Sequence, residues 1–307
     1  MRRIELLITQ VQRATENERV GSTDGISAEE YYQYFSDGQT MLQRRILAVN
    51  NKLFRTSDTF SASGAESYDN APADMFARNM IASLEYSSSG LAKDYVHLKK
   101  RTQGERFSET GTPSQYMLES GRILVNAYPS AGSFRRVYNY KLPRLDKRRT
   151  TVASHTKSAT ALSALTLATT TPFDSADYAL SDYLTIVGWD GTIKMRGIPY
   201  TAVNSGTGVV TIQGTTYTFP SDSTLTNGDQ VCLGEYAATH SLLDDQCEDF
   251  MLTYCQKRIL MRDSSQDVSD LESVLQPMID DILELYSDDP DVQEVPVTGF
   301  SYFQDCD

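Results

Sequence analysis

"VYNYKLPRLDKRR", residues 137–149, begins with the alternation of a β-strand, continues through a proline and ends in a run of cations. Its cations are Lys141, Arg144, Lys147, Arg148 and Arg149. The 307-residue chain as a whole is acidic, with 41 Asp and Glu against 28 Lys and Arg and a formal net charge of −13. A basic cluster in an acidic chain indicates a nucleic-acid contact, a contact with an acidic protein surface, or a solvated turn.

Charge is distributed unevenly along the chain. Residues 1–150 hold 22 Lys and Arg against 17 Asp and Glu, whereas residues 151–307 hold 6 against 24. Neutralising DNA phosphates requires Lys and Arg, so we do not expect a general DNA-binding protein. An acidic surface can still lie beside DNA without adhering to it.

Two helices are predicted before residue 55. Residues 4–11 place apolar side chains at the i, i+3, i+4, i+7 spacing of one helical face. Ser27 followed by Glu30 forms a capping box that starts a second, longer helix. Gly38 lies on the apolar face of that helix, where it allows another backbone to come close. The pair is predicted to form a helical hairpin.

The period changes to that of β-strands from about residue 56. Short β-type runs up to residue 141 alternate with Gly, Pro, Ser and Asn, which predicts a small antiparallel sheet in meander order. Residues 156–171 are of low complexity and predict a linker or an exposed strand. Residues 172–236 contain repeated hairpin signals and predict a small all-β module.

Helical spacing returns after Tyr236 and predicts two C-terminal helices, the second of which Pro277 should kink or divide. The acidic tail, residues 290–307, carries Phe300, Tyr302 and Phe303. Such a tail either docks into a groove on another protein or folds back onto its own chain.

These patterns together predict an α+β fold. A helical bundle, made of the N-terminal hairpin and the C-terminal helical pair, accompanies an antiparallel β-sheet and an inserted all-β module. The expected divisions are a hairpin and meander over 1–150, a linker and module over 151–236, closing helices over 237–289, and an extended tail over 290–307.

Signals of catalysis are weak throughout the sequence. Four cysteines form no CxxC pair and the three histidines lie far apart, so we predict reduced thiols and no metal or cofactor site. No recognisable nucleophile elbow or phosphate-binding loop is present. We find no signal peptide and no apolar run long enough to span a membrane. The sequence therefore favours a protein that is not an enzyme.

One stretch has a familiar pattern. "NAYPSAGSFRRVYNYKLPRLD" (126–146) resembles the head-to-tail adaptor, or connector, proteins of short-tailed bacteriophages. Those proteins also open with a helical pair whose second helix begins with an acidic, tyrosine-bearing turn and contains a polar "DGQ" step, matched here by "SAEEYYQYFSDGQ" (27–39). The motifs cover about 1–55 and 115–150, while 238–290 is similar only in arrangement. Residues 172–236 depart from the smaller members.

The resemblance implies a structural virion protein at the head-to-tail interface. It implies a ring of about twelve copies bound below the portal, a DNA channel through which the genome passes without specific binding, and a platform for tail nozzle or tail fibre proteins. Phe300, Tyr302 and Phe303 would then contact the portal.

For the opening cluster we predict a contact between subunits. Residues 241–307 hold 17 acids against 3 bases, and in a ring one basic edge can face the acidic edge of the next copy. A solvated turn and a DNA contact remain the alternatives. The alternative function is a carbohydrate- or receptor-binding tail component, with Trp189, Tyr200 and Tyr217 as stacking residues of the 172–236 module. A third hypothesis, a tail-associated hydrolase, has the least support.

Overall fold

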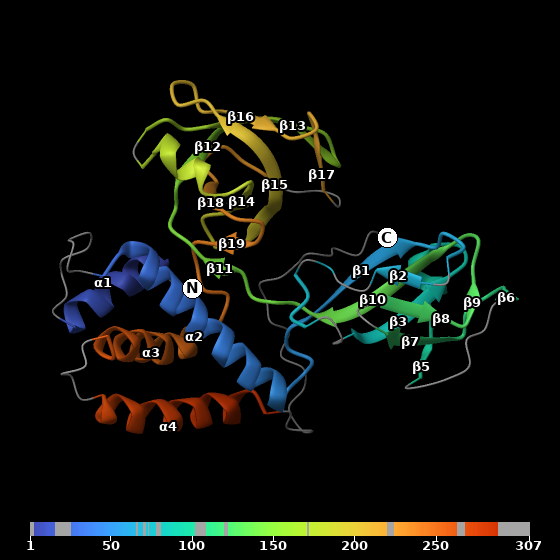
Figure 1. Ribbon diagram of the computed structural model, residues 1–307, viewed down its shortest axis with the longest axis horizontal. Helices are drawn as coiled ribbons and strands as arrows, with labels where there is room; N and C mark the ends of the chain where they lie inside the picture. Colours follow the sequence, from blue (N-terminus) through green and yellow to red (C-terminus); the bar gives the residue numbers. More distant parts are fainter. Residues whose placement is uncertain are drawn as a thin grey trace. The chain divides into compact units, whose positions relative to one another are not determined.

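The computed structural model describes residues 3–15, 26–65, 67–69, 72, 74–77, 81–101, 109–119, 122–170, 172–219, 224–262 and 268–287. The chain is a mixed α and β protein, as predicted (Figure 1). It forms two compact units, one of residues 1–45 with 143–307 and one of residues 46–142. The expected segment 1–150 is therefore divided between the two units.

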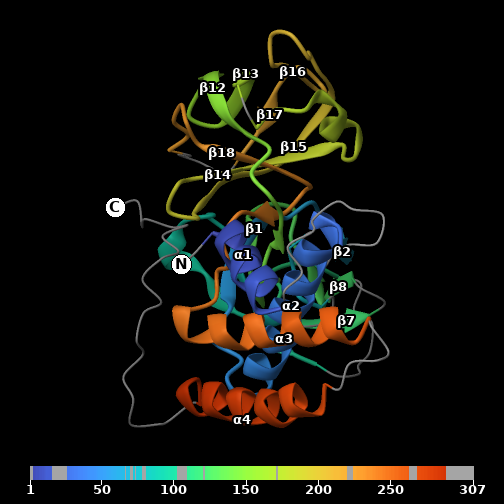
Figure 2. The same ribbon diagram turned by 90° about the vertical axis from the view of Figure 1, so that its left-hand side faces the viewer.

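Helices and a β-barrel make up the first unit. Its helices are α1 (Ile4–Ala14), α2 (Ala28–Val49), α3 (Glu248–Leu260) and α4 (Ser269–Leu285), and α2 extends just past the division between the units. The α3 helix contacts both α1 and α4, and it lies between them in both ribbon views (Figures 1 and 2). No helix of the described ranges combines the length and the apolar character needed to cross a membrane.

Local sequence signals account for how these helices begin and pack. The capping box at α2 is present, because Glu30 accepts a hydrogen bond from the Ser27 backbone N–H at 2.8 Å. A Cβ at Gly38 would lie 2.9 Å from the ring of Tyr254 on α3, which explains the glycine on this face. Pro277 was expected to kink or divide the last helix, and α4 runs through it undivided.

The barrel is a closed ring of six antiparallel strands. They are β12 (Thr150–Lys157), β18 (Gln230–Leu233), β14 (Tyr183–Val187), β15 (Ile193–Val203), β16 (Val209–Ile212) and β13 (Ala161–Leu167), in the order in which they pair. The pairing of β12 with β13 closes the ring, and β17 (Tyr217–Thr218) adds to β13. Closure leaves these six strands without a free edge and encloses one apolar core.

The barrel begins earlier than the sequence indicated. Residues 156–171, for which a linker and an exposed strand were both open, contain the end of β12 and the whole of β13. Leu162, Leu165 and Leu167 of β13 are buried in the barrel core. The segment is therefore not a linker, although Leu162 and Leu165 depart from the strict alternation of a strand and its pairing with β12 is irregular. Two short strands, β11 (Arg144–Leu145) and β19 (Ala237–Ala238), pair in parallel at the two ends of the barrel segment.

The second unit contains two four-stranded sheets that share one apolar core. One sheet has the order β1 (Arg55–Ser61), β10 (Ser133–Asn139), β3 (Ile81–Ser87), β4 (Val96–His97). The other has the order β2 (Ser67–Asp69), β8 (Arg122–Val125), β7 (Gln115–Glu119), β5 (Lys99–Lys100), with β6 (Glu109–Thr110) paired to β9 (Ala127–Tyr128) beside it. Phe60, Tyr68 and Phe134 bring their rings together within this core.

The expected single meander is wrong for this unit. The β10 strand pairs with β1 and β3, which are distant in sequence, and β5 pairs in parallel with β7. The alternation of residues along a strand indicates its two faces but not the strands with which it pairs. The order of the strands in these sheets could therefore not be predicted from it. Arg136 of β10 is paired within the unit, since it binds Asp58 through two hydrogen bonds of 2.6 Å.

Candidate functional site: the basic segment and its junction

The segment that follows the β10 strand enters a buried polar junction with α2. Gln39, only 1% exposed, donates a hydrogen bond from Nε2 to the carbonyl of Pro143 at 2.9 Å. Its Oε1 accepts a hydrogen bond from Ser241 Oγ at 3.0 Å. One turn away, Ser36 Oγ accepts the backbone N–H of Leu145, also at 3.0 Å.

This junction unites motifs that are remote in sequence. Gln39 belongs to the "DGQ" step and Pro143 to "KLPRL", 104 residues further along the chain. A buried amide left without partners costs about 1–3 kcal/mol, so each side of the junction requires the other. The junction fixes the position of the chain just before the cations of residues 147–149.

The basic segment itself, residues 146–149, forms an ionic cluster within its own chain. Arg149 is 4% exposed, and its Nη2 lies 2.8 Å from Asp146 Oδ1. Its Nη1 lies 3.1 Å from Asp177, which belongs to the short helix Ser175–Ala179. Glu29, in the first turn of α2, lies 3.5 Å from the guanidinium. Arg149 therefore ties the barrel and α2 together.

Burial and charge act in opposite directions on Arg149. Desolvation alone would lower the pKa of its guanidinium, but hydrogen bonds and attraction to Asp146 and Asp177 outweigh it, so the pKa is raised. Asp146 is held from a second side, because its Oδ2 accepts the backbone N–H of Leu233 at 3.0 Å. The Arg149 guanidinium therefore stays charged at any ordinary pH.

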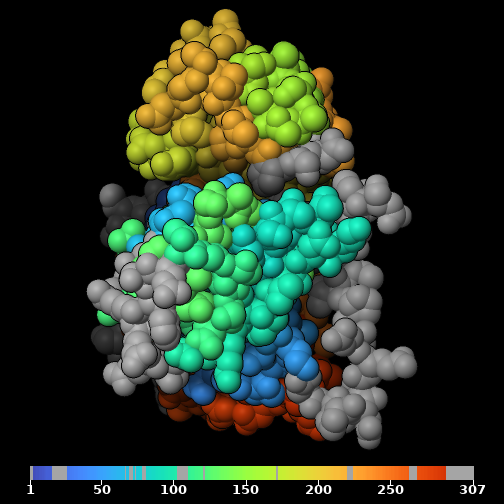
Figure 3. Space-filling view, turned by 90° about the vertical axis from the view of Figure 1, so that its right-hand side faces the viewer, coloured from blue at the N-terminus to red at the C-terminus, as the bar shows by residue number. Residues whose placement is uncertain are grey.

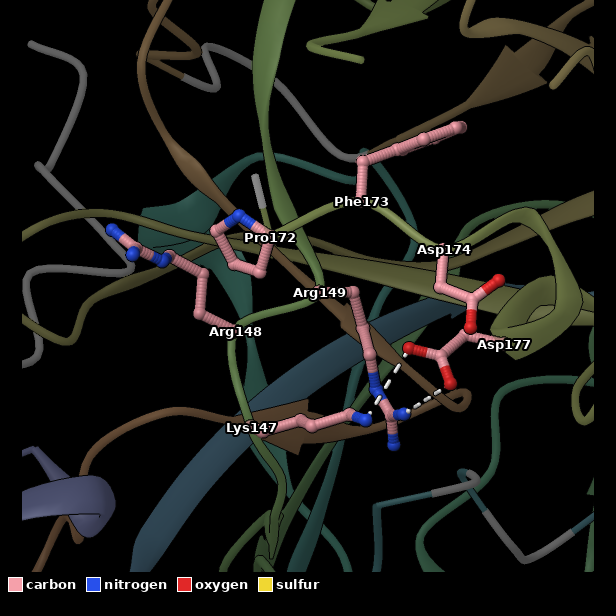
Figure 4. A pocket seen from close by; sticks show the side chains of 7 residues that line it. All are labelled: Lys147, Arg148, Arg149, Pro172, Phe173, Asp174 and Asp177. Atoms are coloured by element: carbon pink, nitrogen blue, oxygen red, sulfur yellow. Dashed lines mark ion pairs between the residues drawn. The ribbon is translucent and has the colours of Figure 1, made fainter. Parts of the chain in front are cut away.

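The neighbouring cations point in different directions. Figure 4 shows Lys147 directed with Arg149 toward Asp177, whereas Arg148 points away. Lys147 Nζ lies 3.4 Å from Asp177 Oδ2. The Arg148 guanidinium lies over the ring of Trp189, 5.7 Å from its centroid. These side chains line a shallow pocket whose seven residues Figure 4 labels. Its lining holds three cations and two acids, and two of the cations, Lys147 and Arg149, already pair with Asp177.

This geometry shows which of the five cations of the predicted subunit contact are exposed to solvent. Arg149 faces the interior of its own chain, so its charge is not offered to a neighbouring copy. Lys147 and Arg148 are half-buried and engaged as described. Lys141 and Arg144 are exposed, and their contact with another subunit stays a prediction. The sequence identified the cations but missed their partners Glu29, Asp146 and Asp177, since only folding brings these together.

The three aromatic residues predicted to stack against a sugar differ in their exposure to solvent. Trp189 is 56% exposed in the loop between β14 and β15. Tyr200 is buried in the barrel core and donates a hydrogen bond to the carbonyl of Tyr178 at 2.6 Å. Tyr217 is half-buried against the same core. Phe300, Tyr302 and Phe303 lie outside the described residues.

Three cysteines and one histidine of the described ranges are buried, and burial favours their neutral forms. Cys232, Cys247 and Cys255 are buried free thiols, and burial raises the pKa of each, that of Cys247 to about 11. Burial also lowers the pKa of His240, whose Nδ1 lies 2.8 Å from Thr239 Oγ1. Among the residues with a described position, no group of three His, Cys, Asp or Glu side chains is arranged to hold a metal ion.

Comparison with known proteins gives no assignment. No protein-family model matches the chain, and no curated protein is similar enough to be matched.

Proposed function

We propose that this chain is a structural virion protein, a head-to-tail adaptor that forms a ring under the portal and extends the DNA channel toward the tail. The observation that carries the proposal is the Gln39–Pro143 hydrogen bond of 2.9 Å. It joins the two motifs on which the resemblance to connector proteins rests. Motifs that meet in one buried junction act as a single structural unit, which supports treating the resemblance as a whole.

In this proposal each part of the chain has a mechanical role. The N-terminal hairpin and the C-terminal helical pair act as one bundle that builds a ring of about twelve copies. The partners are the portal protein, tail nozzle or tail fibre proteins and other copies of the chain. The acidic balance of the chain lets genomic DNA pass without the strong phosphate binding of a basic wall. No catalysis and no cofactor are required.

The test is binding to purified portal rings. We expect the full chain to add a ring of density to one end of the portal in electron micrographs. A variant lacking residues 290–307 should keep its circular dichroism spectrum and lose portal binding, since the tail is proposed to dock there. Failure of the full chain to bind portal rings would contradict the proposal, and unfolding of the shortened variant would contradict the role of the tail.

A second candidate, carbohydrate binding by the barrel, is favoured by one observation. Trp189 is the only tryptophan of the chain and is 56% exposed. Exposed aromatic rings commonly bind sugars by stacking, but Tyr200 is in the core and cannot join such a platform. Glycan-array binding that disappears in Trp189→Ala would support this candidate over the adaptor.

A further inference from the structure

One side of the two-sheet unit is formed by a single continuous segment, residues 91–101, which we name the basic edge. It supplies β4, the last strand of one sheet, and then β5, the last strand of the other. Buried Leu98 lies between these two strands, and its N–H donates to the Leu84 carbonyl at 2.8 Å. Two sheet edges are thereby placed on the same side of the unit.

The basic edge is exposed along almost its whole length. Leu91 and Val96 are large apolar residues in contact with solvent, and Val96 is 66% exposed. Lys93, Lys99 and Lys100 are exposed as well, and none forms an ion pair within the described ranges. Figure 3 looks onto the teal part of this unit, where the sequence around residue 100 reaches the surface. Apolar side chains set among free cations are suited to an acidic protein surface that also has apolar contacts.

The α4 helix has the complementary character. Val274, Asp281 and Leu285 follow one another along one face at helical spacing, and all three are exposed, Leu285 at 62%. Glu284 is also exposed, and the last turn contains no basic residue. Acids at a helix C-terminus are repelled by the helix dipole, so this arrangement disfavours the isolated helix. We name these four residues the acidic face.

The two compact units differ strongly in charge. The unit of residues 46–142 holds 12 Lys and Arg against 9 Asp and Glu, a net charge of +3. The other unit holds 16 against 32, a net charge of −16. DNA would meet the field of the whole chain, whose net charge of −13 opposes binding. Another copy of the chain offers the basic edge an acidic, partly apolar surface instead.

We propose that the basic edge of one copy binds the acidic face of α4 on a second copy. The contact is heterologous, since different surfaces of the two copies meet, and repeated contacts of this kind close into a ring or continue as a filament. The inference deepens the proposed adaptor function, on which it rests for the ring, by naming the surfaces through which copies meet. It names residues 91–101 as a basic side of the contact that the sequence did not indicate.

A charge-exchange experiment tests the contact. One variant reverses the basic edge (Lys99→Glu with Lys100→Glu), and another reverses the acidic face (Asp281→Lys with Glu284→Lys). Self-association of each full-length chain is measured by sedimentation velocity at low salt over a wide concentration range. We expect weak association of the natural chain and at least about tenfold weaker association of each variant alone.

Mixing the two variants gives the sharpest result. Each reversed edge then finds an oppositely charged face on the other variant, so association should return only in the mixture. The control is Arg44→Glu with Arg45→Glu, which makes the same charge change at exposed α2 positions and should associate as the natural chain does. The α4 variant should also melt at a higher temperature than the natural chain, since lysines suit a helix C-terminus. That result excludes misfolding as the cause of lost association.

Several outcomes would overturn the inference. It fails if the natural chain does not associate at any concentration, if either variant associates like the natural chain, or if the mixture does not recover. Binding of duplex DNA that disappears with Lys99→Glu and Lys100→Glu, together with unchanged association, would assign the basic edge to DNA instead. If association returns in the mixture but the chain does not bind portal rings, the contact between copies is supported and the adaptor function is contradicted. If the chain binds portal rings but association does not return in the mixture, the adaptor function is supported and this contact is contradicted.

Discussion

Replacing Arg149 by methionine should destabilise the unit that contains the barrel by about 3 kcal/mol. Methionine keeps much of the apolar stem of arginine and removes its charge. The substitution leaves Asp146 buried without its partner at 2.8 Å. Breaking a buried ion pair from one side costs about 3–5 kcal/mol. The lower end applies here, because Asp146 keeps the Leu233 N–H and Asp177 keeps Lys147.

Urea unfolding followed by tryptophan fluorescence is a suitable assay. The single tryptophan, Trp189, lies in a barrel loop beneath the Arg148 guanidinium, so its emission reports on this unit. The matched control is Arg144→Met, at an exposed position of β11 five residues earlier, which should change the free energy of unfolding by less than about 0.5 kcal/mol. Adding Asp146→Asn to Arg149→Met should recover part of the loss, because the unpaired buried charge is removed. Equal stability of Arg149→Met and Arg144→Met would refute the reasoning.

Three further predictions concern other parts of the chain. The pKa of His240 is lowered below its ordinary 6.5, so its contribution to the free energy of unfolding is complete above about pH 6.5. That contribution is lost as the pH falls through the pKa of the folded state. His240→Asn should remove this pH dependence of the melting temperature. Gly38→Ala should lower the free energy of unfolding by about 1–2 kcal/mol, because the added Cβ meets the Tyr254 ring. This cost exceeds the gain from the better helix propensity of alanine. Adding Tyr254→Leu should recover part of the lost stability. Gly208→Ala should disrupt the barrel, since φ is +70° there and a Cβ would clash with the Leu167 carbonyl oxygen. Loss of near-ultraviolet circular dichroism would show the disruption, and an unchanged spectrum would contradict it.

Local signals in the sequence predicted local structure well. The Ser27–Glu30 capping box and the apolar spacing of residues 4–11 marked two helices, because each signal depends only on residues within two turns. Gly38 was predicted to admit another backbone, and the structure places the side chain of Tyr254 there instead. The mixed α and β content followed from the same periodicities.

Features that depend on distant pairing were not predictable in the same way. Residues 156–171 lack charge after Lys157, so their polar and apolar alternation was weak evidence, and only the barrel shows β13 as one of its strands. The five cations of residues 141–149 were conspicuous in an acidic chain. Their individual roles depend on carboxylates such as Glu29 and Asp177, which lie more than twenty residues away and become neighbours only in the fold.

The most direct test of the adaptor function is electron microscopy of virions labelled with an antibody against the barrel, residues 150–238. The proposal predicts label at the neck, between the head and the tail, and a ring of density below the portal that is missing from particles made without this chain. Label on the fibres, on the capsid surface, or nowhere on intact particles would contradict it.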